Sequence, residues 1–387
     1  MNSQESTIVR DRIRSALEES RNRGEEAIQV AAYLDGQLII NEAIGEARPG
    51  QAATTSTLFP VFSVSKALTA TALHRQAELG LVDYESPVAK YWPEFAAHGK
   101  EAITVRHVLS HRSGIPWMPE GVTPELQANW SWMITQIEQT QPSYGAGSTN
   151  CYHALIWGWI VAEIVRRTDT MGRPFEQFLR EEVLDPIGVT DAYLGLPESQ
   201  DLRVATLLGG SVPLAGPEDL YLHGMPPAVF PGSVVYNTAL SRRTINPGAG
   251  IIADAKSIAR FFAVLAGRGE LDGVRLLSED RVLSFTEPRP DTEQPDAYMG
   301  VPAHVGTSGY WVGGPAPAGY ALLGDNPQLL HHPGAGGSIG WAELDTGLAV
   351  AINHNFMRDA AGEDPFTPVV TAVRETAAEL LGRVGAV

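Results

Sequence analysis

The chain has 387 residues, of which 44% are hydrophobic and 19% charged, and its formal net charge at pH 7 is −17. This length and composition predict a folded globular protein with a large apolar core, arranged as one unit or two lobes. The negative charge argues against nucleic acid or an anionic membrane surface as a partner.

Other features of the composition favour the cytoplasm. The single cysteine, Cys151, excludes an internal disulfide and a cysteine-rich metal site. The first 23 residues are polar and charged, unlike a signal peptide or an anchor. No apolar run reaches the ~20 residues needed to span a bilayer. We therefore expect a cytoplasmic protein with no membrane partner, as a monomer or a dimer.

The N-terminal third begins with a helical pattern over residues 4–22. Two strand-like segments, 27–34 and 37–44, flank Asp35-Gly36, which is typical of a tight hairpin turn. The next helix is expected from Ser63 to about Glu78 and ends before Gly80. Helical periodicity then recurs over residues 103–109, 124–140, 152–168 and 174–184.

The second half of the chain begins with residues 197–250, whose Gly, Pro and weak periodicity predict long loops, a candidate lid over a site. The remaining pattern predicts helices over residues 254–267 and 278–285, strand fragments within 286–335, a hairpin over 339–344 and 348–353, and a helix over 368–381.

Strands thus gather at both ends of the chain and helices in the middle. This order predicts an α+β fold, an α/β sandwich in which both chain ends form one antiparallel sheet flanked by the terminal helices. Residues 1–66 and 290–387 would form this α/β lobe, and residues 67–289 an inserted, mainly helical lobe. The helix that starts at Ser63 would lie at the junction, where binding clefts tend to form.

Ser63 and Lys66 form an S-x-x-K pair at the start of that helix. Residues three apart lie on one helical face, so the Lys66 amine can reach the Ser63 hydroxyl, whereas Ser65 lacks this spacing. A serine becomes a strong nucleophile when a neighbouring base accepts its proton, and a lysine can do so only when it is neutral. The alternative is an N-cap serine followed by a surface lysine, but apolar Phe62 and Val64 favour a buried site.

Two further stretches accompany this pair, Cys151 to Trp159 and His331 to Ser338. Together the three resemble the motifs of the serine β-lactamase and penicillin-binding-protein superfamily. The pattern is most similar to the family VIII carboxylesterases, which share the class C β-lactamase fold. The resemblance also takes in residues 103–116 and 271–278, and so covers most of the chain.

The resemblance implies a role for each matching residue. Ser63 matches the acylated nucleophile, Lys66 the lysine that takes its proton, and Tyr152 the tyrosine that acts as a base or carries a proton to the leaving group. The backbone N–H groups of Ser63 and Ala335 match the oxyanion hole. Gly334 suits close approach of substrate to the strand edge, because it has no side chain.

The sequence departs from the lactamase pattern at two motifs. Tyr152-His153-Ala154 replaces Tyr-x-Asn, and His332-Pro333-Gly334 replaces Lys-Thr-Gly. The lost amide and the lost lysine both weaken recognition of a β-lactam, which favours esters. We expect His332 and Gly334 on the substrate side, with Trp117 lining an apolar pocket. We also name His153 as a candidate for a substrate contact.

Two other patterns in the sequence compete with this interpretation. Residues 336–340 match G-x-S-x-G around Ser338, but that nucleophile elbow needs a strand before it and a helix after it. His107 and His111 have the H-x-x-x-H spacing, but no Glu follows His107, and His111 falls where the helix is expected to end. We therefore expect no metal, and the absence of a dinucleotide-binding glycine motif predicts no nucleotide cofactor.

The function expected from these residues is hydrolysis of small carboxylic esters with short acyl chains, through an acyl-enzyme on Ser63. Three alternatives stay open: an acyltransferase of the same fold acting on a natural-product scaffold, a β-lactamase or D-amino-acid peptidase, and a non-catalytic binding protein. The physiological ester and its stereochemistry are not encoded in any motif.

Overall fold

The predicted N-terminal hairpin forms the edge of the main sheet. A computed structural model describes residues 3–212, 220–314, 321–358 and 364–384. In it, Asp35 and Gly36 adopt φ of 47° and 75°, as a tight turn of this type requires. This turn joins β1 (Ile28–Leu34) to β2 (Gln37–Ile44), and the two strands pair antiparallel.

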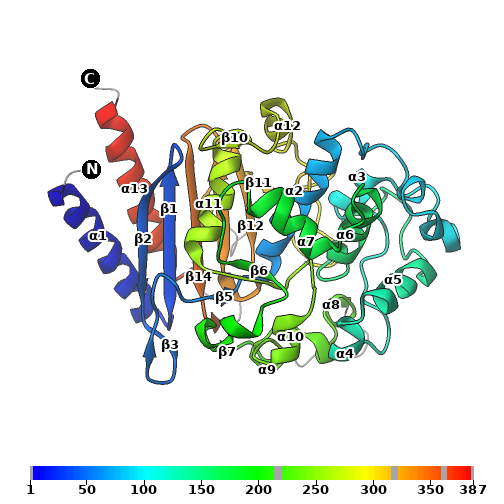
Figure 1. Cartoon of the computed structure of the whole chain (residues 1–387), viewed down its shortest axis with the longest axis horizontal. Helices are drawn as coiled ribbons and strands as arrows, with labels where there is room; N and C mark the ends of the chain where they lie inside the picture. The colour runs from blue at the N-terminus through cyan, green and yellow to red at the C-terminus, as the bar shows by residue number, and fades with distance from the viewer. Residues whose placement is uncertain (1–2, 213–219, 315–320, 359–363, 385–387) are drawn as a thin grey trace.

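Both ends of the chain contribute to one six-stranded sheet of order β11-β12-β13-β14-β1-β2 (Figure 1). Its remaining strands are β11 (Trp311–Val312), β12 (Leu329–Pro333), β13 (Ile339–Glu343) and β14 (Leu348–His354). Every neighbouring pair is antiparallel. The β14–β1 pair joins the two ends of the chain, with Ala31 opposite Ala351. The expected fold class is therefore confirmed.

Helices cover both faces of this sheet. The strands β1 and β14 are therefore buried along their whole length. Val30 and Ile352 face a core shared with α1 (Ser3–Asn22) and α13 (Thr367–Val384), which lie side by side. Ala31 and Ala351 face the opposite core, which includes α11 (Ala255–Ala266). This alternation is the two-residue period of a strand buried on both sides.

The α11 helix falls within the range expected for the helical lobe, yet it packs on β1, β13 and β14. Its tight packing is visible at Gly340, where an added Cβ would lie 2.3 Å from the Phe262 ring. The helix belongs with the sheet because most of its residues are apolar and buried. The lobe boundaries expected from the sequence therefore do not separate the helices that pack on the sheet from those that do not.

The other helices gather beyond the sheet around α2 (Ser65–Glu78), which packs against α6 (Trp157–Thr168) (Figure 1). Around them lie α3 (Val105–Leu109), α4 (Pro124–Gln127), α5 (Trp130–Gln139), α7 (Phe175–Leu179), α8 (Leu220–Gly224), α9 (Ser233–Tyr236), α10 (Ala239–Arg243) and α12 (Glu279–Ser284). The short helical turns are η1 (Phe62–Val64), η2 (Val88–Lys90), η3 (Pro93–Gly99), η4 (Arg180–Leu184), η5 (Glu198–Arg203), η6 (Pro227–Val229), η7 (Ala321–Leu323) and η8 (Ala335–Gly337).

Small strand pairs tie these elements together. A three-stranded sheet joins β5 (Phe59–Pro60), β8 (Ile251–Ala253) and β6 (Ala192–Leu194). The remaining pairs are β3 (Glu46–Arg48) with β4 (Gln51–Ala52), β7 (Leu208–Gly209) with β15 (Phe356–Met357), and β9 (Glu270–Leu271) with β10 (Val274–Arg275).

Two expectations about local structure need correction. The helix expected over 152–168 begins only at Trp157, and Cys151 to His153 are non-helical. The region 197–250, expected as loops, contains the short helices η5 and α8 to α10 among its described residues, and 213–219 lie outside them. Within the part of the chain that the structure describes, no helix has the length and apolar character to cross a membrane.

Candidate active site

Ser63 lies on a strained turn between β5 and α2. The turn is fixed by hydrogen bonds from Val61 N to Ile251 O at 3.0 Å and from Val64 N to Val61 O at 3.2 Å. Phe62, directly before the serine, has a φ of 47°, which is rare for a bulky residue and costs about 1–3 kcal/mol. Its buried ring packs against Tyr236, with 4.9 Å between the ring centroids. This packing holds a conformation that presents Ser63, which is partly exposed, at the start of α2.

Lys66 is fully buried one turn further along. Its Nζ donates to Ser63 Oγ at 3.0 Å, to Ala154 O at 2.7 Å and to Gly248 O at 2.9 Å. Burial lowers the pKa of Lys66 to about 7, because the charged amine loses its hydration. The neutral amine is therefore populated near neutral pH and can accept the proton of Ser63.

The surroundings of Lys66 depend on a close contact between α6 and the 246–250 segment. An added Cβ at Gly158 would lie 2.1 Å from the backbone nitrogen of Gly248. Any larger residue at 158 would push Gly248 away, and its carbonyl is one of the three acceptors for Lys66. Gly158 thus allows the close approach on which this hydrogen bond depends.

Tyr152 meets the same amine from a distant part of the chain. Lys66 Nζ lies 5.1 Å from the centroid of the Tyr152 ring. His111 stacks on that ring at 4.6 Å, and Trp311 stands edge-on to it at 6.0 Å. Tyr152 is 8% exposed, so its ring is packed and only a small part of the residue is accessible. The structure thus brings Ser63 and Tyr152 together around the side-chain amine of Lys66.

The third motif lies against the nucleophile turn. An added Cβ at Gly334 would lie 2.5 Å from Val61 O, so the end of β12 touches the residue two before Ser63. Gly334 N donates to Ser338 O at 2.6 Å, which closes the loop that carries Ala335. Ala335 packs against the small cluster that contains Phe62. These contacts place Ala335 beside the Ser63 turn, as an oxyanion hole built from their two N–H groups requires.

His332 lies in strand β12, where the motif resemblance matches it to the lysine of the lactamases. It is fully buried, and its Nδ1 lies 2.9 Å from Pro333 O. This carbonyl can only accept, so Nδ1 carries the proton and Nε2 is left as an acceptor. Nε2 has no hydrogen-bond partner among the described residues. Burial, followed by the nearby Lys66 charge, holds the pKa of His332 well below its usual range, so the ring is neutral at pH 7.

The position of His153 does not support a contact with substrate. Its ring is fully buried, with Nε2 2.7 Å from Ser113 Oγ and Nδ1 2.5 Å from Cys151 O. Burial lowers its pKa to about 4. His153 therefore supports the loop around Tyr152, because both of its ring nitrogens are occupied by protein groups.

Trp117 belongs to an aromatic cluster that includes Tyr152. Its members are Trp117, Tyr152, Tyr221 and Tyr298. Tyr298 is the central member, with its ring 6.2 Å from Tyr152, 6.4 Å from Trp117 and 5.4 Å from Tyr221. The indole of Trp117 also donates to Ser143 Oγ at 2.9 Å. Sequence reasoning identified Trp117 but missed Tyr298 and Tyr221, because they lie in segments without a motif.

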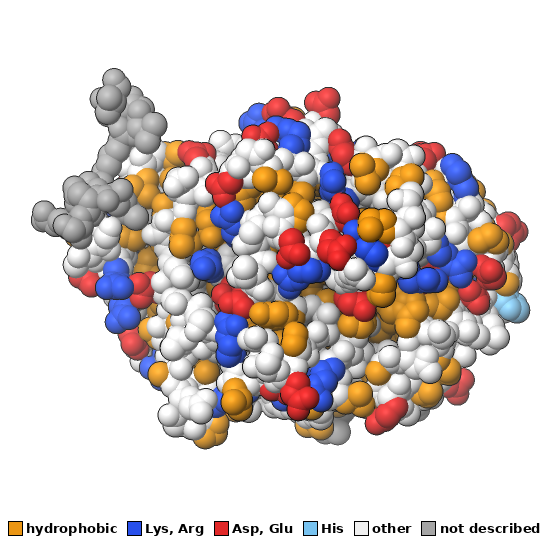
Figure 2. Space-filling view, viewed as in Figure 1, with side chains coloured by type: hydrophobic (Ala, Val, Ile, Leu, Met, Phe, Trp, Pro, Cys, Tyr) orange, Lys and Arg blue, Asp and Glu red, His pale blue; other side chains and the backbone are white. Residues whose placement is uncertain are grey.

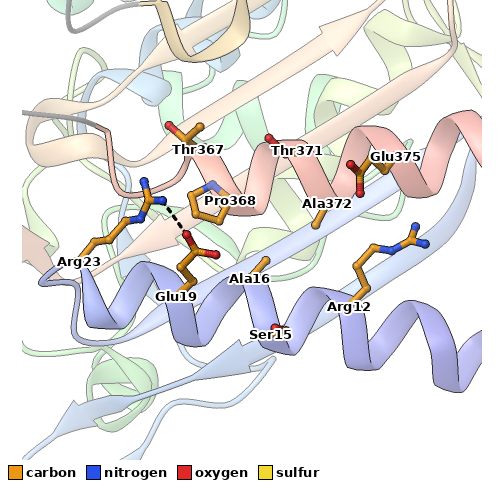
Figure 3. Close-up of a pocket in the computed structure, with 10 residues that line it drawn as sticks. All are labelled: Arg12, Ser15, Ala16, Glu19, Arg23, Thr367, Pro368, Thr371, Ala372 and Glu375. Atoms are coloured by element: carbon orange, nitrogen blue, oxygen red, sulfur yellow. Dashed lines mark hydrogen bonds and ion pairs between the residues drawn. The ribbon is translucent and has the colours of Figure 1, made fainter.

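The competing motifs have other roles in the structure. Ser338 is buried, and it is followed by strand β13 rather than by a helix. His107 Nδ1 accepts from Thr104 N, whereas His111 Nδ1 accepts from His153 N, so the two rings are used separately. A groove between α1 and α13, lined by residues such as Arg12, Glu19 and Thr371, contains none of the predicted site residues (Figure 3).

The fold and the site define a known class of protein. Residues 9–369 match the family model described as Beta-lactamase. The chain therefore belongs to the β-lactamase family, within a group of serine hydrolases that includes both esterases and β-lactamases.

Individual relatives narrow this class. The chain is similar to a protein named Esterase/beta-lactamase LipL from Mycobacterium tuberculosis, with 33% identity over 372 residues, covering 90% of this chain and 82% of the relative. It resembles the crystal structure of a family VIII carboxylesterase, with a TM-score of 0.85, 28% identity and coverage of 97% and 98% of the two chains. A penicillin-binding protein homologue from Caulobacter crescentus matches with a TM-score of 0.82, 27% identity and coverage of 95% and 98%. The family expected from the motifs is thus confirmed.

Proposed function

We propose that this chain hydrolyses carboxylic esters with short acyl chains through an acyl-enzyme on Ser63. The observation that carries the proposal is the 3.0 Å hydrogen bond between Lys66 Nζ and Ser63 Oγ, made by a buried amine whose pKa lies at about 7. A lysine of this kind can act as the base that a serine nucleophile needs.

In the first half of the reaction, Ser63 Oγ attacks the ester carbonyl carbon while its proton passes to neutral Lys66. The backbone N–H groups of Ser63 and Ala335 stabilise the oxyanion, a contribution of roughly 3–4 kcal/mol per donor in other acyl-transfer enzymes. The bond to the alcohol oxygen then breaks, and Tyr152 relays a proton to that oxygen. Water attacks the acyl-enzyme by the reverse proton path, which releases the acid and restores Ser63.

The third motif favours neutral esters over β-lactams. The lactamase lysine would offer a cation to the substrate carboxylate, whereas His332 is neutral at pH 7. The aromatic cluster adds apolar surface beside Tyr152, which suits a small uncharged acyl or alcohol group. The family VIII carboxylesterase likeness supports the same choice.

The direct test compares two serines. S63A should reduce turnover of p-nitrophenyl butyrate by at least about 10⁴-fold, because it removes the nucleophile. S338A is the matched control, since Ser338 lies in the competing G-x-S-x-G motif, and it should keep turnover within about threefold of wild type. Loss of activity in S338A with retention in S63A would overturn the proposal.

β-Lactam hydrolysis is the second candidate, favoured by the name of the Mycobacterium tuberculosis relative. It would use the same Ser63 chemistry with a cyclic amide in place of the ester. Nitrocefin turnover measured beside p-nitrophenyl butyrate separates the two. We expect kcat/KM for nitrocefin to be at least about 100-fold lower, because His332 offers no cation.

A further inference from the structure

A buried ion pair contacts the backbone of the Tyr152 segment. Arg289 Nη2 and Asp296 Oδ2 are 2.7 Å apart, and both side chains are fully buried. The other carboxylate oxygen of Asp296 accepts three backbone N–H groups, from Tyr152 at 2.9 Å, Tyr298 at 2.9 Å and Met299 at 3.1 Å. One carboxylate thus holds the backbone of the proposed proton carrier and of the central member of the aromatic cluster.

The Tyr152 segment needs such external support because it is not part of a helix or a strand. Three successive backbone N–H groups are bound by distant residues. Cys151 N donates to His111 O at 3.2 Å, Tyr152 N to Asp296, and His153 N to His111 Nδ1 at 2.9 Å. His111 and Asp296 therefore fix the position of the segment, and Asp296 does so at the residue that carries the phenol.

The same carboxylate connects Tyr152, the proposed proton carrier, to Tyr298 in the aromatic cluster. Tyr298 N and Tyr152 N share one oxygen of Asp296, and their rings lie 6.2 Å apart. A shift of Asp296 would move the proposed proton carrier and the aromatic cluster together. Arg289 holds Asp296 in place and itself donates to Ser110 O at 3.1 Å.

We propose that Asp296, held by Arg289, is a positioning residue that sets Tyr152 for proton transfer and aligns Tyr298 beside it. This proposal rests on the ester-hydrolase function proposed above. Asp296 acts through backbone groups, so the property that matters is an oxygen acceptor at its position. The negative charge serves only to pair with Arg289.

This distinction gives a sharp experiment. Removing one partner of a buried ion pair strands a charge, whereas replacing both partners by uncharged residues of similar size is often tolerated. In R289Q/D296N the asparagine oxygen still accepts the Tyr152 N–H. In R289M/D296L both charges are also gone, but no acceptor remains. The two double variants therefore differ at the feature that the proposal invokes.

We expect R289Q/D296N to keep kcat for p-nitrophenyl butyrate within about fivefold of wild type, and R289M/D296L to lose roughly 100-fold, the size of effect that a misplaced catalytic group produces. The loss should be in kcat more than in KM. On a Y152F background, R289M/D296L should add little further loss, because both changes disable the same residue. Equal kcat in the two folded double variants, or full additivity with Y152F, would overturn the proposal.

The control is another buried pair, Asp169 with Arg173 at 2.9 Å, where the aspartate also accepts a backbone N–H. D169L/R173M should lower the thermal midpoint without lowering kcat, because this pair lies outside the site. If R289M/D296L does not fold, R289Q/D296A replaces it, and its kcat must fall at least about tenfold below that of R289Q/D296N. A smaller fall would overturn the proposal.

The outcomes also separate this proposal from the proposed function. If wild type shows no ester turnover that depends on Ser63, the function fails and the positioning role fails with it. If wild type turns over esters but R289M/D296L matches R289Q/D296N, only the positioning role fails.

Discussion

Lys66 is the residue on which the proposed chemistry of this site depends most. Three oxygens accept its protons, an arrangement that suits an ammonium, while complete burial lowers its pKa to about 7. The balance of these two effects leaves both protonation states accessible near neutral pH. A base of this kind is matched to its task at physiological pH.

The pH dependence of catalysis should report this balance. For ester hydrolysis, kcat/KM should rise with pH through an apparent pKa of about 7 and then level off, because only neutral Lys66 accepts the Ser63 proton. Initial rates at low substrate from pH 5 to 9 measure this limb. If the rise were centred near pH 10, the pKa of an ordinary lysine, the pKa of Lys66 would not be lowered in the free enzyme.

At this scale the sequence was informative where the signal is local. Ser63 and Lys66 are three residues apart on one helix, so their contact could be predicted from the spacing. Asp296 could not be found in this way. It is one of several acidic residues in an irregular, Pro-containing segment, and its contact with Tyr152 spans 144 positions of the chain.

Among the elements, the contact between β12 and η1 is the one that shapes the proposed oxyanion site. Gly334 has ordinary extended backbone angles, φ −102° and ψ 153°, so it is not needed for its conformational freedom. It is needed because its neighbour is close: an added Cβ would lie 2.5 Å from Val61 O, a backbone atom of the nucleophile turn. A methyl group there must push β12 and η1 apart.

G334A should therefore reduce kcat by roughly 10–100-fold, because the Ala335 N–H moves away from the oxyanion position. G382A is the matched control, since Gly382 has no neighbour within 4 Å of an added Cβ and lies in helix α13. Alanine there should leave kcat unchanged and slightly raise the thermal midpoint. Steady-state kinetics and thermal unfolding of both variants test this; a G334A enzyme with wild-type kcat would contradict it.

The elements themselves were predicted unevenly. The hairpin at Asp35-Gly36 and the amphipathic helix α11 follow from local pattern, and both are present. The sequence pattern predicts a start of α6 that is too early, because Tyr152 and His153 continue the apolar pattern of the helix. Asp296 accepts the backbone N–H of Tyr152, and His111 accepts that of His153. These hydrogen bonds hold both residues outside the helix.

On the scale of the whole molecule, the site brings together separate parts of one chain. Ser63 and Lys66 lie at the start of α2, Tyr152 precedes α6, and Ala335 follows a strand of the main sheet (Figure 1). Acidic and basic side chains are intermingled over the face drawn in Figure 2, despite the net charge of −17. Burying the Lys66 amine away from water lowers the free energy of unfolding by an amount that depends on pH.

The sign of this dependence follows from linkage. Between pH about 7 and 10.5 the unfolded chain holds a proton on Lys66 that the folded chain has lost, so the free energy of unfolding rises with pH in this window. K66M lacks the group. The free energy of unfolding of wild type relative to K66M should therefore increase by roughly 2–3 kcal/mol between pH 7.5 and 9.5.

Urea unfolding of both proteins at the two pH values measures this difference. Hydrogen bonds lost in K66M shift its stability equally at both pH values, so they cancel from the comparison. A difference that stays constant with pH would show that the folded and unfolded states hold this proton equally.

The overall architecture was predictable because strands lie at both ends of the sequence and helices in between, an order that few folds accommodate. The lobe boundaries were not predictable to the same degree. Whether an apolar helix such as α11 packs on a sheet or on other helices depends on partners distant in sequence, and its own pattern is the same in both cases.

The most direct test of the account is the mass of the protein quenched during turnover of p-nitrophenyl butyrate. We expect a fraction of the protein to be heavier by one butyryl group, and peptide mapping should locate that group on Ser63. The adduct should be absent from S63A and present in S338A. Turnover with the butyryl group on another residue, or with no acylated protein at any quench time, would contradict the covalent mechanism.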